Sequence, residues 1–243
     1  MRQKDLARER ICFDVLRSVE GKEVVLIGGY AVSAYGPPRF SVDLDLVLKR
    51  SALVTVRDEL LSRGFRKDAE WRGGDVFEGR SERWILGSGQ LPISADILIG
   101  GISDRVSGAA HSYESLRKRS SPRTLRGLNP LSVARPLVPD REVLIALKLE
   151  VGRLIDLRDI AILAGERVDG GNVISFLSGA SENLILEHAR ALLASIERKE
   201  FKDSLKGVYM LDDRAYQRYA AGARNLALWI ERRLTHPGGN NGT

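Results

Sequence analysis

The sequence has 243 residues, of which 43% are hydrophobic and 29% charged, as in an ordinary globular protein. Its formal net charge is +6 and its pI is near 9.6, which favours polyanionic partners such as nucleotides or RNA, although a basic solvated surface has the same charge. The single cysteine, Cys12, excludes an internal disulfide framework and a multi-cysteine metal site, and we expect a buried, inert thiol. Neither a signal peptide nor an apolar stretch of about 18 residues is found, which predicts a cytoplasmic protein without a membrane partner.

The first part of the chain alternates between helical and extended patterns. Apolar residues at helical spacing indicate helices, whereas short β-branched runs between glycine-containing turns indicate strands. The expected elements, in order, are a helix over 3–19, a strand over 24–27, a helix over 30–35, a strand over 40–48, a helix over 51–63 and short strands over 66–71, 75–79, 82–88 and 91–99.

Two features of this part predict a site for phosphates and a metal ion. Gly28 and Gly29 lie between a strand and a helix start, where backbone N–H groups can face a phosphate. Asp43 and Asp45 are two residues apart on a predicted strand, so their side chains share one face. Because adjacent carboxylates repel each other, a hard divalent cation such as Mg²⁺ is their usual partner.

These residues resemble the signature of the DNA polymerase β-like nucleotidyltransferase superfamily. The resemblance is carried by the Gly-Gly-Tyr-Ala sequence at 28–31 and by Arg-Phe-Ser-Val-Asp-Leu-Asp at 39–45. The spacing is most similar to the bacterial and archaeal branch that includes the AbiEii-type toxins. A lone Asp-x-Asp pair is common by chance, and the combination of strand, Gly-Gly, helix and Asp-x-Asp strand is more specific.

The resemblance implies a metal site made of three acids. Asp43 and Asp45 would bind two Mg²⁺ or Mn²⁺ ions, and a third acid on a later strand would complete the catalytic set. Asp96, the single acid of the apolar strand over 91–99, is the matching position. A carboxylate in an apolar setting usually needs a partner or a metal. The alternative is an aspartate near a strand end that faces water.

The same resemblance assigns nucleotide-binding roles to residues around the glycines. Gly28 and Gly29 have no Cβ, so the backbone can approach a triphosphate closely. Arg39 would offset phosphate charge, and Ser41 would contact a phosphate or stabilise the turn into the strand.

Residues 100–130 show less regular patterns. The segment 117–126 carries five basic residues and is interrupted by serines and a proline, which indicates a mobile basic loop or a broken helix. Such a segment could hold RNA phosphates without reading sequence, or it could be a solvated run of charge. Residues 131–137 are expected to form a last strand. The aromatic residues before this segment are expected to pack or lie on a sheet face rather than stack on bases: Trp71, Phe77 and Trp84.

A second motif follows a predicted helix over 139–149. Lys148 is followed by Arg153 and by Asp156 and Asp159, and AbiEii-type relatives show a similar Lys, Arg and Asp-x-x-Asp run. The resemblance implies that Lys148 lies near the NTP phosphates, that Arg153 and Asp159 help to bind the nucleotide, and that Asp156 is catalytic.

Helix geometry is consistent with a common site for this motif. On one continuous helix, Lys148 and Asp159 would be about 20° apart and Asp156 within about 80°, although Gly152 is placed to break that helix. Ile155 stands where relatives often carry a lysine, which leaves the local charge network open. The alternative is structural, with Arg153 and Asp156 forming an ion pair between helices.

The remainder of the chain has apolar residues at helical spacing. Helices are expected over 172–177, 181–198, 201–211 and 213–234. The predicted fold class is α/β (α+β), with a nucleotidyltransferase domain over 1–138 that has a mixed β-sheet flanked by helices, a helical domain over 139–235, and a disordered tail over 236–243.

The expected function is metal-dependent transfer of an NMP from an NTP, bound between the two domains, to an acceptor hydroxyl on RNA, such as tRNA, or on protein. The resemblance also suggests the toxin of a toxin–antitoxin pair, with an antitoxin protein as partner. Two alternatives remain: a catalytically silent nucleotide-binding or partner subunit, and a transferase acting on a small molecule such as an aminoglycoside. Kinase-type transfer is disfavoured because the sequence has neither a Walker lysine loop nor a kinase catalytic loop.

Overall fold

The computed structural model describes residues 3–41, 43–72, 80–87, 92–103, 108–177 and 179–236. The chain divides into two compact units, and the boundary between them falls after Asp140. The sheet unit contains the described residues up to Ser103 and those from Ala110 to Asp140, and the helical unit contains Gly108, Ala109 and those from Arg141 onward. The strand predicted over 75–79 and the tail predicted from 237 onward lie outside the described residues.

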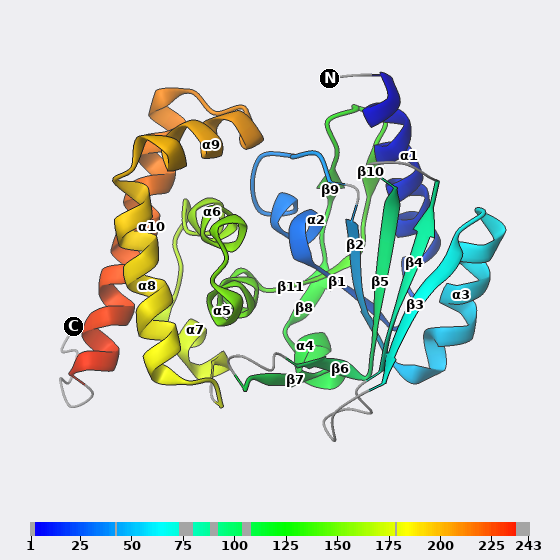
Figure 1. The fold of residues 1–243 in the computed structure, drawn as a ribbon, viewed down its shortest axis with the longest axis horizontal. Coiled ribbons are helices and arrows are strands. Elements are labelled where there is room, and N and C mark those ends of the chain that lie inside the picture. The colour runs from blue at the N-terminus through cyan, green and yellow to red at the C-terminus, as the bar shows by residue number, and fades with distance from the viewer. Residues whose placement is uncertain are drawn as a thin grey trace. The chain divides into compact units, whose positions relative to one another are not determined.

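The helices and strands are shown in Figure 1. The elements of the sheet unit are α1 (Gln3–Ser18), β1 (Val24–Ile27), α2 (Gly28–Ser33), β2 (Asp43–Leu48), η1 (Arg50–Ala52), α3 (Leu53–Ser62), β3 (Arg66–Arg72), β4 (Arg80–Leu86), β5 (Ile93–Ile99), β6 (Gly101–Ser103), β7 (Ala110–Ser112), α4 (Tyr113–Lys118), β8 (Ser120–Pro122), β9 (Leu125–Arg126), β10 (Val133–Ala134) and β11 (Leu137–Pro139). Those of the helical unit are α5 (Arg141–Val151), α6 (Leu154–Leu163), α7 (Gly170–Phe176), α8 (Glu182–Ile196), α9 (Lys199–Tyr209) and α10 (Asp213–Thr235).

The sheet unit is built on a seven-stranded mixed sheet, in the order β3-β4-β5-β2-β1-β11-β8. Strand β2 runs parallel to β5, and β1 runs parallel to β11, whereas the other neighbours are antiparallel. This confirms the predicted mixed sheet flanked by helices. The strand predicted over 131–137 is instead two short strands, of which β11 joins the large sheet and β10 pairs with β9.

The side chains of β2 alternate between two faces of the sheet, of which one is apolar and the other carries acids. Leu44, Leu46 and Leu48 are fully buried, because alternate side chains of a strand point to the same face. Asp43 and Asp45 therefore lie on the opposite face, as the sequence predicts. We call this second face the acidic face.

Two elements that flank the acidic face begin at different residues from those predicted. Helix α2 begins at Gly28, so the two glycines form its first turn instead of preceding it. Strand β2 begins at Asp43 rather than at residue 40, and Val42 lies outside the described residues.

The basic segment 117–126 is made of regular elements, so it is neither of the two alternatives predicted for it, a mobile loop or a broken helix. It contains the end of α4, strand β8 and strand β9. Arg119 donates to Asp140 over 3.1 Å, and the guanidinium carbon of Arg123 lies 4.1 Å from the centroid of the Tyr35 ring. Two of the five basic side chains of this segment therefore have partners within the sheet unit.

The single cysteine lies in the core, on α1. Cys12 is fully buried, and burial raises the pKa of its thiol to about 12. The predicted buried thiol is confirmed.

In the helical unit, the helices expected after residue 170 are present as α7 to α10, and α8 packs against α10 (Figure 1). The continuous helix considered for the lysine motif is interrupted at Gly152, which has a φ of +65°. The His188 ring lies so close that any Cβ at Gly152 would overlap it, and His188 Nδ1 is 2.6 Å from the Leu149 carbonyl oxygen. Glycine is therefore required at this break. No helix of the described residues is both long and apolar enough to span a bilayer.

Candidate functional site

The acidic face gathers the three predicted acids on neighbouring strands. Asp45 on β2 is the Cα partner of Asp96 on β5, and Asp43 is the partner of Ser94. Directly opposed residues of neighbouring strands point to the same face, so all three carboxylates share it. Asp43 Oδ1 accepts a hydrogen bond of 2.6 Å from the Ser94 hydroxyl.

The first turn of α2 meets the acidic face at Gly28. This residue has a φ of +69°, and a Cβ there would overlap the Asp45 carboxylate. A Cβ at Gly29 would overlap the guanidinium of Arg39, a residue that is only 9% exposed. The structure thus brings each predicted glycine against a predicted charged residue. At Gly28 the positive φ also favours glycine, whereas at Gly29 an added side chain would require the end of the Arg39 side chain to move.

Ser41 lies at the entrance to β2. Its carbonyl accepts a hydrogen bond of 2.6 Å from the Tyr30 hydroxyl, and its own hydroxyl is 3.4 Å from the backbone nitrogen of Asp43. These contacts fit the turn-stabilising alternative of the two roles considered for Ser41.

Asp96 has a basic partner that sequence reasoning missed. Arg83 on β4 is its Cα partner, and Arg83 Nε and Nη2 donate to the two carboxylate oxygens of Asp96 over 2.7 and 2.8 Å. Asp96, which accepts these hydrogen bonds, raises the pKa of Arg83 above its ordinary value. The strand alternation around Arg83 is visible in the sequence, but its pairing with Asp96 depends on the register of β4 and β5.

The carboxylate oxygens of the acidic face are ligands of the type that a hard cation such as Mg²⁺ prefers. Within the described residues, no three Asp, Glu, His or Cys side chains are arranged so that they could hold a metal ion. Asp43 and Asp45 lie together on β2, and Mg²⁺ is commonly held by one or two carboxylates together with substrate phosphates. The carboxylate oxygens of Asp43 and Asp45 are the donor type that suits such an ion, and Asp96 accepts hydrogen bonds from Arg83.

The second motif forms a buried ion cluster in the helical unit. Lys148 Nζ lies 2.9 Å from Asp156 Oδ1 and 2.9 Å from Asp159 Oδ2. The side chains of both acids are 1% exposed, and that of Lys148 is 13% exposed. The acids converge on the lysine although the chain turns at Gly152, because α5 and α6 pack side by side.

Arg153 and Tyr209 complete this cluster. Arg153 is the N-cap of α6, and its Nε donates to Asp156 Oδ2 over 2.7 Å. Tyr209, at the end of α9, donates its hydroxyl proton to Asp159 Oδ1 over 2.5 Å. Arg153 and Asp156 therefore do form the ion pair considered for them, but not between two helices. Both residues belong to the start of one helix, and Lys148 makes the contact between helices.

The electrostatics of the cluster keep the lysine charged. Burial acts to lower the pKa of Lys148, but the carboxylates of Asp159 and Asp156 outweigh it and hold this pKa above its ordinary value. Burial acts to raise the pKa of Asp156, yet hydrogen bonds and charge from Arg153 and Lys148 hold it below its ordinary value. The cluster thus presents an ammonium group whose direction is fixed by two buried carboxylates.

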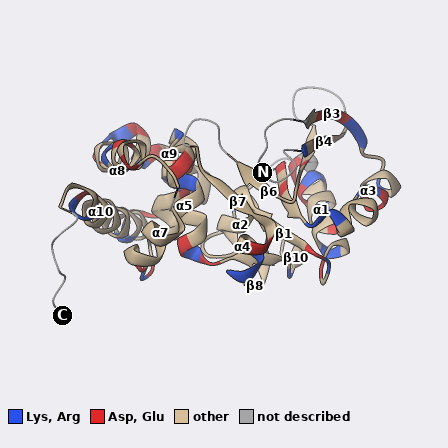
Figure 2. Ribbon diagram, turned by 90° about the horizontal axis from the view of Figure 1, so that it is seen from below, with Lys and Arg blue, Asp and Glu red and all other residues tan. Residues whose placement is uncertain are grey.

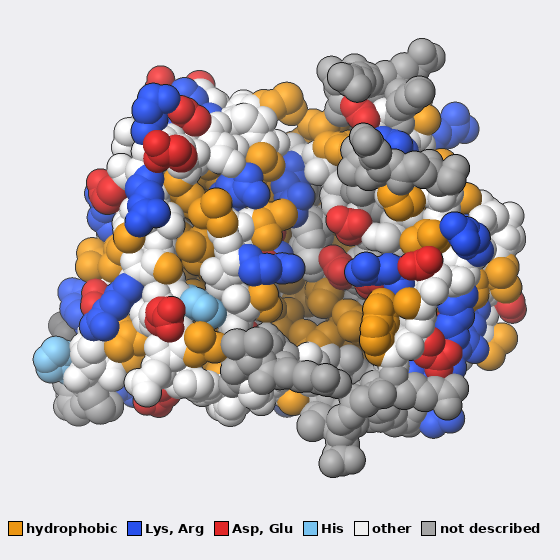
Figure 3. All heavy atoms as spheres, in the orientation of Figure 1, with side chains coloured by type: hydrophobic (Ala, Val, Ile, Leu, Met, Phe, Trp, Pro, Cys, Tyr) orange, Lys and Arg blue, Asp and Glu red, His pale blue; other side chains and the backbone are white. Residues whose placement is uncertain are grey.

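The predicted site residues fall into two groups. Gly28, Gly29, Arg39, Ser41, Asp43, Asp45 and Asp96 belong to the sheet unit, and Lys148, Arg153, Asp156 and Asp159 belong to the helical unit. Basic side chains, by contrast, are spread over both units and interspersed with acidic ones (Figures 2 and 3).

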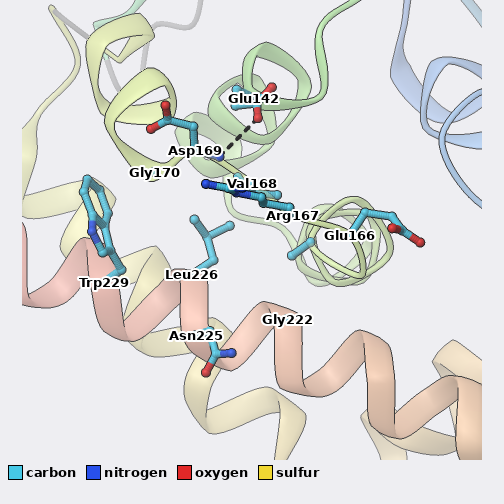
Figure 4. Close-up of a pocket in the computed structure, with 11 residues that line it drawn as sticks. Glu142, Glu166, Arg167, Val168, Asp169, Gly170, Gly222, Asn225, Leu226 and Trp229 are labelled. Carbon is cyan, nitrogen blue, oxygen red and sulfur yellow. Dashed lines mark hydrogen bonds between the residues drawn. The ribbon is translucent and has the colours of Figure 1, made fainter. Parts of the chain in front are cut away.

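A pocket of about 840 Å³ lies entirely within the helical unit, between the 164–170 segment and α10. The Arg167 side chain extends across it toward Leu226 and Trp229 (Figure 4). Glu142 accepts a hydrogen bond from the Asp169 backbone at its rim. None of the residues predicted for the site lines this pocket.

Comparisons with known proteins place the fold. No family model matches the sequence, and a search of curated proteins finds no match. A protein from H. pylori, provisionally named a nucleotidyltransferase, has a similar structure, with a TM-score of 0.50 and 15% identity over 99% of this chain and 100% of that one. MenT4, a nucleotidyltransferase toxin from Mycobacterium tuberculosis H37Rv, is similar with a TM-score of 0.53 and 17% identity over 96% of this chain and 89% of that one. The chain has a nucleotidyltransferase fold, and at these identities the likeness extends to the fold alone.

Proposed function

We propose that the protein is a metal-dependent nucleotidyltransferase, which moves an NMP from an NTP to an acceptor hydroxyl and releases pyrophosphate. The observation that carries the proposal is the acidic face, where Asp43 and Asp45 lie beside the glycine turn of α2. The fold shared with MenT4 and the H. pylori protein supports it.

In this proposal, the residues of the sheet unit hold and orient the nucleotide. Asp43 and Asp45 would hold the divalent cation, which would supply stabilisation of the negative charge that develops in an in-line displacement. The backbone at Gly28 and Gly29 approaches the triphosphate, and Arg39, packed against Gly29, offsets its charge.

The transfer exchanges one phosphorus–oxygen bond for another. The acceptor oxygen bonds to the α-phosphorus, and the bond from that phosphorus to the bridging oxygen of the β-phosphate breaks, so pyrophosphate leaves. The acceptor hydroxyl must lose its proton, and Asp96 is the proposed group that orients this hydroxyl or accepts the proton.

Lys148 is the proposed phosphate-binding group of the helical unit. Its ammonium is held charged and would offset negative charge on the β- and γ-phosphates. Asp156 and Asp159 are both 1% exposed, so we propose that they act by positioning Lys148 and not by contacting nucleotide or metal. Arg153 would support the same arrangement through its contact with Asp156.

The acceptor proposed for this activity is RNA, such as tRNA, or a protein hydroxyl. MenT4 is a nucleotidyltransferase toxin, and this favours the further proposal that the chain is the toxin of a pair. Its partner would be an antitoxin protein. The alternatives are a silent nucleotide-binding subunit of the same fold and a transferase for small molecules.

A transfer assay tests the proposal. The protein is incubated with each NTP labelled at the α-phosphate, Mg²⁺ or Mn²⁺, and total cellular RNA and protein. We expect label in one macromolecular band with the unchanged protein and none with the Asp43→Asn, Asp45→Asn variant. Asp58→Asn is the matched control, because it removes one exposed carboxylate from α3, away from the acidic face.

Each other outcome points to a stated alternative. Label that moves only to an added aminoglycoside would favour the small-molecule transferase. Nucleotide binding without transfer to any acceptor, by a protein with an intact circular dichroism spectrum, would favour the silent subunit. Transfer that survives in the double aspartate variant would contradict the proposed site.

A further inference from the structure

Arg83 stands in line with the acids of the acidic face. It is the Cα partner of Asp96 on β5, and Asp96 is in turn the partner of Asp45 on β2. The three side chains therefore form one row across three neighbouring strands, with steps of about 4.8 Å. A cation bound by Asp45 would lie next to a carboxylate that is already occupied by a guanidinium.

Two partners hold Arg83 in this row. Both oxygens of Asp96 accept its hydrogen bonds, in the two-pronged geometry that suits a carboxylate. On its other side, the guanidinium carbon lies 5.8 Å from the centroid of the Trp71 ring, which is within the range of a cation–π contact. Trp71 is 51% exposed, so this ring packs on the surface and not in the core.

Arg83 and Asp96 lie where another cation can replace the guanidinium of Arg83. The side chain of Arg83 is 45% exposed and that of Asp96 is 22% exposed, so water reaches both groups. A guanidinium that leaves the carboxylate can be solvated or can bind phosphate oxygens with the same fork. A divalent cation that takes its place offers Asp96 twice the charge.

We propose that Arg83 is a resident counter-cation, which holds Asp96 away from the metal site until a divalent cation displaces it. This inference rests on the proposed function, because it assumes a metal at Asp43 and Asp45. In the nucleotide-free protein, two carboxylates, those of Asp43 and Asp45, form the metal site. Asp96 becomes a third ligand only when its contact with Arg83 is broken. Arg83 thus lowers the affinity of the empty protein for metal.

Binding of Mn²⁺ to the nucleotide-free protein tests this inference without any turnover. The free Mn²⁺ is measured by electron paramagnetic resonance in a titration of the unchanged protein and of Arg83→Gln. We expect Arg83→Gln to bind Mn²⁺ about threefold to tenfold more tightly, because the competing cation is gone. Arg83→Lys keeps the charge but loses the fork, so an intermediate gain is expected.

Two further variants separate this mechanism from a general effect of charge. Arg66→Gln removes an exposed arginine from β3 and should change Mn²⁺ affinity less than twofold, because Arg66 pairs in register with Ile85 and not with Arg83. In the Arg83→Gln background, Asp96→Asn should abolish the gain. Thermal unfolding of each variant establishes that it is folded, and the lysine variant carries the test if the glutamine variant is not.

The outcomes distinguish this inference from the proposed function. If Mn²⁺ binding is lost in Asp43→Asn, Asp45→Asn but is unchanged or weaker in Arg83→Gln, the counter-cation role is overturned while the metal site stands. If no variant binds Mn²⁺, both the counter-cation role and the two-carboxylate site are overturned for the nucleotide-free protein, and the transfer assay decides the function separately.

Discussion

Strand β4 carries charged side chains to both faces of the sheet, and the two faces differ in how these charges are held. Glu82 points away from the acidic face and is fully buried. Its carboxylate accepts hydrogen bonds from four side chains: Arg57, Lys67, Arg80 and Trp84. The next residue, Arg83, points to the acidic face, where its pair with Asp96 is open to water.

The difference indicates which acids are available for chemistry. Burial acts to raise the pKa of Glu82, but its donors outweigh burial and hold this pKa at about 2. A buried carboxylate with this many donors has no capacity left for a ligand, and removing its charge weakens all of these hydrogen bonds together. Asp156 and Asp159, the carboxylates of the Lys148 cluster, are buried and paired in the same way, whereas the proposal for Asp96 is that it exchanges its partner. The following predictions test this contrast.

The largest loss of stability is expected for Lys148→Met. This change would leave the carboxylates of Asp156 and Asp159 buried without their shared cation, which typically costs about 3–5 kcal/mol in the free energy of unfolding. Lys206→Met is the matched control, since Lys206 pairs with the exposed Asp213 and should cost at most about 1 kcal/mol. Urea unfolding followed by circular dichroism measures both, and equal losses would contradict the assignment of a buried cluster.

A smaller loss is expected for Glu82→Gln. The pKa of Glu82 is about 2, against an ordinary value of 4.5, and this shift corresponds to about 3 kcal/mol at neutral pH. Asp96→Asn, on the other face, should cost at most about 1 kcal/mol, because its pair is partly exposed. If Asp96→Asn is the more damaging of the two changes in urea unfolding, the contrast between the faces is wrong.

The pH dependence of stability should report the same carboxylate. The pKa of Glu82 is lowered in the folded protein, so its contribution is complete above pH 4.5 and is lost as the pH falls toward 2. Between pH 7 and pH 3 we expect Glu82 alone to remove about 2 kcal/mol from the free energy of unfolding. At acid pH, the free energy of unfolding of Glu82→Gln should fall less steeply with decreasing pH than that of the unchanged protein. Equal slopes would contradict the set of hydrogen bonds assigned to Glu82.

A smaller loss of stability than for Lys148→Met or Glu82→Gln is expected for Gly28→Ala. Its positive φ costs a side chain roughly 1–2 kcal/mol, and the new Cβ would also displace the Asp45 carboxylate. Gly21→Ala is the matched control, because Gly21 has a φ of +71° but no atom within 4 Å of the added Cβ. Both variants should lose similar stability, whereas only Gly28→Ala should weaken Mn²⁺ binding. Equal metal binding by the two variants would show that the position of Asp45 does not depend on Gly28.

Much of the acidic face could be predicted from the sequence, because local patterns determine it. The alternation of Asp43, Leu44 and Asp45 decides which side chains share a face, and a strand followed by two glycines marks the turn of α2. The pair between Arg83 and Asp96 could not be predicted, since it depends on the register of two strands whose pairing is set by the whole sheet. Local sequence gives no measure of that register.

The Lys148 cluster shows a different limit of prediction from local sequence. The spacing of Lys148, Asp156 and Asp159 was consistent with one continuous helix, yet the chain turns at Gly152 and the acids reach the lysine from a second helix. The contact is therefore tertiary. Helical periodicity predicted that the three residues lie together, but for the wrong reason. Tyr209, from α9, could not be connected to Asp159 by any local pattern, because 50 residues separate them.

The burial of Cys12 has a practical consequence for measuring motion. Its thiol is inaccessible, and a pKa of about 12 keeps it protonated at neutral pH, where thiol reagents attack the thiolate. The natural chain can thus serve as a background for site-specific labelling without removal of its own cysteine. One new surface cysteine, placed in either unit, would carry a single dye that reports local motion within that unit.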